Sequence, residues 1–84
     1  MQIQTSLDWQ AVHSELRKQI EQLSFNPDLR RMLNNISNMV SELSSAEVET
    51  RRINKPEYNK LKVDDINKAI NHLEKLLLIA KLMS

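Results

Sequence analysis

The 84-residue chain contains neither glycine nor cysteine. A typical globular chain is about 7% glycine, so about six would be expected. Glycine supplies the backbone geometry of hairpin turns and phosphate-binding loops, so its absence argues against sheet-rich folds and excludes glycine-rich nucleotide motifs. Without cysteine, disulfides, thiolate nucleophiles and cysteine-ligated zinc are excluded. This composition suits a reducing compartment, and we expect a cytoplasmic protein.

Aromatic residues, charge imbalance and long apolar runs are also scarce. Lys and Arg total 12 against 11 Asp and Glu, so the net charge of +1 creates no field that attracts nucleic acid or anionic membrane. The longest apolar run, residues 76–80, is far shorter than the roughly 20 residues that cross a bilayer. We expect no transmembrane segment, and the N-terminal residues have no pattern of a secretory signal.

Two prolines, Pro27 and Pro56, divide an otherwise helix-compatible chain. We predict a single helical domain over residues 1–84, with helices at about 6–24, 27–53 and 57–83. In each helix apolar residues recur every three or four positions, which places them on one face. The fold class is therefore all-α, a small three-helix bundle. The alternative is a long helical hairpin that forms a dimeric bundle.

The apolar stripes predict the core of this bundle. The first helix contributes Trp9, Val12, Leu16, Ile20 and Leu23; the second contributes Leu29, Met32, Leu33, Ile36, Met39, Val40, Leu43, Ala46 and Ile53; the third contributes Val63, Ile66, Ala69, Ile70, Leu73, Leu76, Leu77, Ala80 and Met83.

Capping signals mark the helix starts. Thr5 and Asp8 have the spacing of a capping box, and the run from Asn26 to Asp28 combines an N-cap, a proline suited to the first turn and an acidic residue. Ser44 with Glu47 forms a further capping box, and a break there would give four short helices. We favour one continuous helix, because the apolar phase does not shift at Ser44.

The end of the third helix is apolar on every side. If its inner stripe faces the core, Leu78 and Leu82 form a second stripe that faces outward, and a helix that is apolar all round must be covered. Leu78, Leu82, Ile79 and Met83 are therefore the candidate protein interface. In the simpler alternative, the bundle buries this end itself. A membrane-surface anchor is less favoured, because only Lys75 and Lys81 are basic nearby.

A basic segment joins the second and third helices. Five cations stand against one acid, Glu57, in residues 51–62. Cations with a stacking aromatic residue are typical of phosphate and base contacts. The candidate nucleic-acid contacts are Arg51, Arg52, Lys55, Tyr58, Lys60 and Lys62. A solvated turn explains the same residues, since cations also favour the C-terminal end of a helix.

Catalytic and metal signals are weak. His13 and His72 are the only histidines, and neither has a second ligand at metal-site spacing. Asp64 and Asp65 are adjacent, so on a helix they point about 100° apart and suit capping better than catalysis. We expect no enzyme, no cofactor and no metal.

We therefore expect a small non-enzymatic protein-binding regulator, such as an adaptor, an inhibitor or a chaperone-like factor. It would act through apolar helical faces and self-association, with a protein partner or a homo-oligomer. The frequent Asn, Lys and Ile residues are typical of AT-rich bacterial and phage genomes and favour a phage or mobile-element source. The alternative is a nucleic-acid-binding regulator that uses residues 51–62.

Overall fold

A computed structural model describes residues 1–23, 26–53 and 56–83, apart from the side chains of residues 50–53 and 56–58. A short 3-10 turn, η1 (Ser6–Asp8), leads into helix α1 (Trp9–Glu21), and α2 (Pro27–Ile53) and α3 (Pro56–Met83) follow. The described residues include no strand. The predicted all-α three-helix bundle is confirmed.

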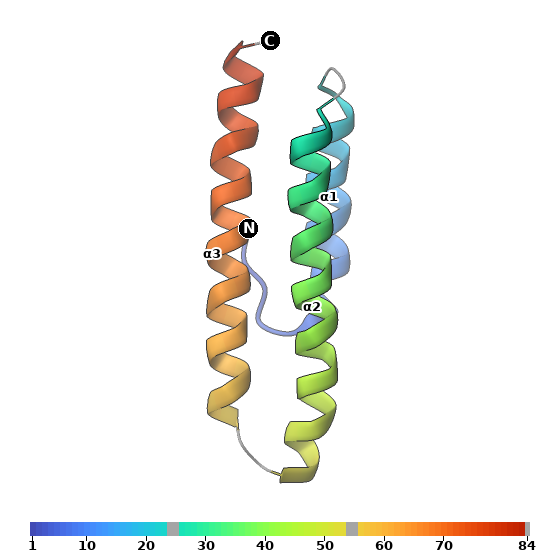
Figure 1. The fold of residues 1–84 in the computed structure, drawn as a ribbon, viewed down its shortest axis with the longest axis vertical. Coiled ribbons are helices and arrows are strands. Elements are labelled where there is room, and N and C mark those ends of the chain that lie inside the picture. Colours follow the sequence, from blue (N-terminus) through green and yellow to red (C-terminus); the bar gives the residue numbers. More distant parts are fainter. Residues whose placement is uncertain (24–25, 54–55, 84) are drawn as a thin grey trace.

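The three helices of the bundle differ in length (Figure 1). α2 and α3 run antiparallel along the whole molecule, which measures 48 × 18 × 15 Å. α1 is half as long and covers only the part of this pair that holds the start of α2 and the end of α3. The molecule is therefore a three-helix bundle at one end and a two-helix hairpin at the other.

One apolar core joins all three helices. Its buried members are Trp9, Val12, Leu16 and Ile20 from α1, Leu29, Leu33, Ile36, Val40 and Leu43 from α2, and Ile66, Ile70, Leu73 and Leu77 from α3, together with Ile3. Burying each large aliphatic side chain contributes about 1.5–3 kcal/mol. The stripes read from the sequence account for every helical member of this core.

The stripes also included residues that the core does not fully enclose. Met32, Met39 and Ala46 are half-buried, and the side chain of Ile53 lies outside the part of the chain that the structure describes. Met83 was predicted to join the core and is 83% exposed, so that prediction was wrong. The last turn of α3 extends beyond the first turn of α2 (Figure 1). Met83 borders an open groove beside α2 instead of being buried.

The start of α1 differs from the prediction. Residues Ser6–Asp8 form the 3-10 turn, and the α-helix covers Trp9–Glu21 rather than residues 6–24. The Asp8 carboxylate Oδ2 accepts the backbone N–H groups of Gln4 and Thr5 at 2.9 and 3.1 Å. These two bonds hold the pKa of Asp8 below its ordinary value of 3.8, and the bond from Gln4 has the larger effect.

α2 begins and continues as the sequence indicates. The Asn26 side chain Oδ1 accepts the Leu29 N–H at 3.3 Å, which caps the helix before Pro27. The helix passes through Ser44 without a break. Glu47 is engaged elsewhere: its carboxylate accepts the Ser6 backbone N–H at 2.9 Å and the Ser6 hydroxyl at 2.5 Å. Glu47 therefore anchors the start of the first helical segment instead of capping a new one.

Residues 1–5, here called the N-terminal strap, cross the bundle beside α3 (Figure 1). Ile3 is buried in the core. The Asn67 side chain holds the backbone of Ile3 on both sides: Oδ1 accepts its N–H at 2.8 Å and Nδ2 donates to its carbonyl at 2.9 Å. The terminal ammonium of Met1 lies 2.7 Å from Glu74 Oε1. The strap thus fills part of the core between α1 and α3.

Candidate functional site

The last turns of α3 expose a set of large apolar side chains. Leu73 and Leu77 are buried, and Leu76 and Ala80 are half-buried against the core. The outward side chains remain open to solvent: Leu78 is 59% exposed, Ile79 51%, Leu82 79% and Met83 83%. We call these four residues the C-terminal apolar face. The simpler alternative, in which the bundle buries this end of the helix, is therefore wrong.

The face has two sides. Leu78 lies toward α1, beside Gln19, and the Lys81 ammonium next to it donates to the Gln19 carbonyl Oε1 at 2.8 Å. Ile79 and Met83 lie toward α2 and border a groove of about 480 Å³. The groove is lined by Leu23, Leu29, Met32, Leu76, Ile79, Ala80 and Met83, with Asn26 and Asp28 as polar members. Exposed apolar side chains and an apolar groove thus lie side by side.

No family model, curated protein or solved structure matches this chain. Its function is therefore inferred from its own surface. An exposed apolar side chain leaves about 1.5–3 kcal/mol of burial free energy unrealised, and contiguous exposed apolar patches mark interaction sites. Scattered single residues would need no explanation, but Leu78, Ile79, Leu82 and Met83 share one helix end.

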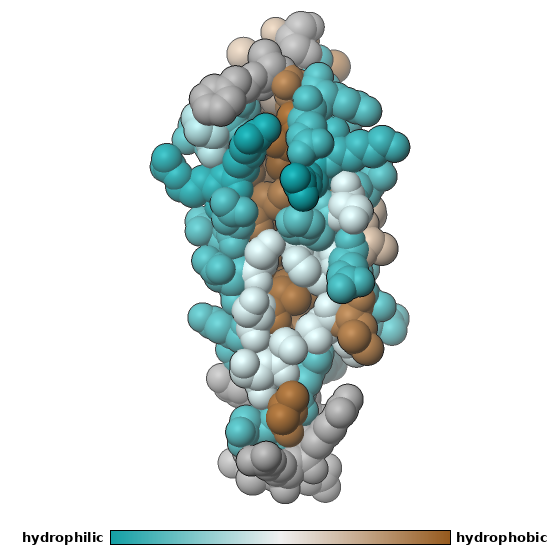
Figure 2. Space-filling view, turned by 90° about the vertical axis from the view of Figure 1, so that its right-hand side faces the viewer, coloured by the Kyte–Doolittle hydropathy of each residue, from teal (hydrophilic) through white to brown (hydrophobic). Residues whose placement is uncertain are grey.

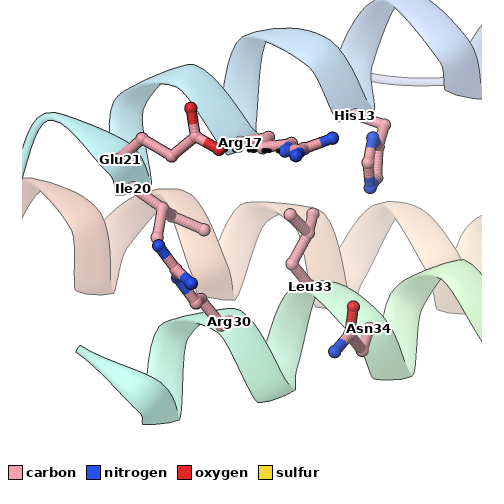
Figure 3. Close-up of a pocket in the computed structure, with 7 residues that line it drawn as sticks. All are labelled: His13, Arg17, Ile20, Glu21, Arg30, Leu33 and Asn34. Atoms are coloured by element: carbon pink, nitrogen blue, oxygen red, sulfur yellow. Dashed lines mark hydrogen bonds and ion pairs between the residues drawn. The ribbon is translucent and has the colours of Figure 1, made fainter. Parts of the chain in front are cut away.

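A second groove, of about 290 Å³, lies between α1 and α2 (Figure 3). Arg17 Nε donates to Glu21 Oε1 at 3.0 Å, and the His13 ring meets Trp9 edge-on with 5.4 Å between ring centroids. Arg30 and Asn34 approach from α2. Figure 2 shows the apolar seam between hydrophilic side chains on this side of the molecule. Arg17 is paired with Glu21 within its own helix, as in a solvated helix seam.

Most of the basic segment, residues 51–62, lies outside the side chains that the structure describes. Lys55 is not among the described residues, and neither are the side chains of Arg51, Arg52 and Tyr58. Lys60 is exposed. The Lys62 ammonium lies 3.8 Å from Glu42 Oε2, so part of its charge is balanced by α2. Nucleic-acid contact through this segment stays a prediction.

The two histidines lie on different helices, His13 on α1 and His72 on α3. Among the side chains that the structure describes, no three acidic, histidine or cysteine residues come together as a metal site. Within residues 1–23, 26–53 and 56–83, no helix has the length and hydropathy to span a membrane.

Proposed function

We propose that this chain is a small non-enzymatic protein-binding regulator that docks its C-terminal apolar face against another polypeptide. The observation that supports this proposal is the exposure of Leu78, Ile79, Leu82 and Met83 at one end of α3. Docking removes these side chains from water. It either blocks the partner's surface that they cover or holds the partner in place. Self-association is one form of this activity, and adaptor or inhibitor action on a different chain is the other.

The chemistry of the face suits a protein partner. Leucine and isoleucine supply burial free energy, and Met32 and Met83 line a groove whose flexible side chains adapt to the shape of an incoming helix. The centres of protein interfaces are apolar and depleted in charge, while their rims are polar. Asn26 and Asp28 lie at this groove as such polar members.

Site-specific photo-cross-linking tests the proposal. A benzoylphenylalanine replaces Leu82 in the full chain, and the chain is irradiated in the cells that naturally contain it. We expect discrete cross-linked adducts of defined mass from position 82. The matched control carries the same group in place of Leu7, which is 84% exposed on η1.

Adducts that form at position 82 and not at position 7 support docking through this face. Equal adduct patterns at both positions, or none at position 82, would contradict the proposal. Circular dichroism of both labelled chains confirms that each remains helical, since both positions point into solvent.

A further inference from the structure

We infer that the N-terminal strap is a releasable cover, which turns about Thr5 and leaves the seam between α1 and α3 while the three helices stay packed. Release takes Ile3 out of the core and opens the slot that this side chain fills. The inference goes beyond the proposed function and is independent of it. The strap is bonded to α3 by Asn67 and Glu74, which are not part of the C-terminal apolar face.

Two anchors on different helices place the hinge of the strap. On one side, Ser6 is tied to α2, because Glu47 accepts both its backbone N–H and its hydroxyl. On the other side, Ile3 is tied to α3 by the two hydrogen bonds of Asn67, at 2.8 and 2.9 Å. Thr5 lies between these anchors, extended (φ −138°, ψ 169°) and exposed. The strap can therefore leave α3 while η1 keeps its attachment to α2.

The strap is bonded to the helices through side chains. Among the described residues, no backbone hydrogen bond joins residues 1–5 to the backbone of α1, α2 or α3. The N–H groups of the last two strap residues bond to Asp8, so these bonds stay within the hinge region. The Met1–Glu74 ion pair lies at the surface, where such pairs contribute little. Release therefore breaks no hydrogen bond within a helix.

Burial in the strap is concentrated in one side chain. Ile3 is 1% exposed, whereas the other four residues of the strap are exposed to solvent. Segments with few buried contacts open locally, at a free energy below that of global unfolding. The burial of Ile3 and its pairing with Asn67 therefore hold the strap closed.

The helices also have contacts of their own that do not involve the strap. α1 packs mainly against α2 and less against α3, and the strap crosses from the start of α1 to α3 (Figure 1). The buried residues of α1 belong to a core that all three helices share. Release thus removes one member of this core and leaves the helices in contact with one another.

The slot that an open strap vacates has a defined chemistry. The Asn67 carboxamide presents an acceptor and a donor side by side, which match the N–H and the carbonyl of one residue in an extended backbone. Beside it lies the apolar place that Ile3 fills in the core. A synthetic peptide with the sequence of residues 1–6 is therefore a suitable probe for the vacated slot.

Native-state amide hydrogen exchange of the wild-type chain tests the release. After correction for intrinsic rates, the Ile3 N–H should exchange at least about tenfold faster than the Leu16 and Leu73 N–H groups within α1 and α3. Low concentrations of urea should speed exchange at the two helix positions and leave Ile3 unchanged, because a local opening exposes little surface. Exchange of Ile3 at the helix rate, with the same urea dependence, overturns the inference.

The full-chain variant Ile3→Ser gives a second measurement. We expect it to keep the helical circular dichroism of wild type, because the helices stay packed without the strap. The peptide of residues 1–6 should bind this variant at least about tenfold more tightly than it binds wild type, whose own strap competes from within the chain. A control peptide with serine in place of Ile3 should bind at least about tenfold more weakly, because it buries no aliphatic side chain. NMR shifts of the Asn67 carboxamide report binding.

Leu7→Ser is the matched control, because it makes the same change at a residue that is 84% exposed on η1. It should bind the peptide as weakly as wild type does. Loss of the helical signal in Ile3→Ser overturns the inference, because the helices would then require the strap. A folded Ile3→Ser chain that binds both peptides equally, or neither, overturns it as well.

Discussion

Asn67 is the residue that ties the N-terminal strap to α3. Its carboxamide pairs with both the N–H and the carbonyl of Ile3, as a neighbouring strand would. Ile3 is 1% exposed, so the strap contributes a full aliphatic side chain to the core. A polar side chain on α3 thus fixes an apolar residue more than 60 positions away in the sequence. The strap has no helical hydrogen bonds of its own, so this pairing holds it together with the Met1–Glu74 ion pair and the bonds to Asp8.

Replacing Asn67 with alanine should lower the free energy of unfolding by about 1–3 kcal/mol, because the partly buried N–H and carbonyl of Ile3 lose their partners. Urea denaturation monitored by circular dichroism measures the change. Asn71→Ala, one turn further along α3 at an exposed position, is the control and should change stability far less. Equal losses from the two variants would show that the strap is not held in this way.

Asp8 makes stability depend on pH. Its pKa is lowered in the folded chain, so the carboxylate favours folding at pH values above its ordinary 3.8. The contribution is lost as the pH falls below 3.8 and through the lower folded value. We expect Asp8→Asn to be less stable than wild type at pH 7 and to approach it as the solution becomes strongly acidic.

Urea unfolding between pH 7 and pH 2 measures this difference. Asp65→Asn, at an exposed position on α3, controls for the loss of one negative charge. A constant gap between wild type and Asp8→Asn across the whole range would refute the assignment.

The bounds and the continuity of helix α2 could be predicted from the sequence. Its bounds, Pro27–Ile53, match the sequence prediction because the Asn-Pro-Asp start and the residue before Pro56 are strong local signals. Its continuity through Ser44 follows from an unbroken apolar phase. The 3-10 turn before α1 was not predicted, and its first residue, Ser6, bonds to Glu47, 41 residues away.

Ser44 provides a direct test of this continuity. In a continuous helix Ser44 lies in the middle of α2 with its side chain exposed to solvent. Ser44→Ala should then raise the free energy of unfolding by about 0.5 kcal/mol, because alanine has the higher helix propensity. If Ser44 were an N-cap, the same change would instead lower the free energy of unfolding by about 1 kcal/mol. Ser6→Ala is the contrasting variant: it removes the hydroxyl bonded to Glu47 and should destabilise. Destabilisation by Ser44→Ala would favour two separate helices.

The residues that sequence reasoning missed share a physical cause. Ile3 lies among polar residues with no period to mark it, and its backbone is held by Asn67 from a distant helix. Met83 has the helical phase of the core stripe, but it borders an open groove at the end of α3 and is 83% exposed. The periodicity of apolar residues indicates which side of a helix is apolar. Whether that side is covered depends on the lengths of the neighbouring helices. The exposure of Leu78 and Leu82 was predictable, because their phase points away from Leu73 and Leu77.

At the scale of the whole molecule, unequal helix lengths produce the candidate face. A short α1 on a long α2–α3 hairpin gives an elongated chain with a large surface, and the end of α3 carries apolar side chains that no described helix covers. Local stability and the candidate face thus have separate sources. The core from Ile66 to Leu77 holds α3 in place, and the turns beyond it present the C-terminal apolar face.

Oxidation of Met83 by hydrogen peroxide, followed by mass spectrometry, tests the central claim that this face is open in the lone chain and covered when the protein acts. Met83 should oxidise rapidly in dilute purified protein, because its side chain is 83% exposed, and several-fold more slowly inside the native cell. Half-buried Met39, which does not line the groove, is the internal reference, and its own oxidation rate normalises that of Met83 in both samples. Met83 that is protected in the dilute chain, or that oxidises equally fast in the cell, would contradict the claim.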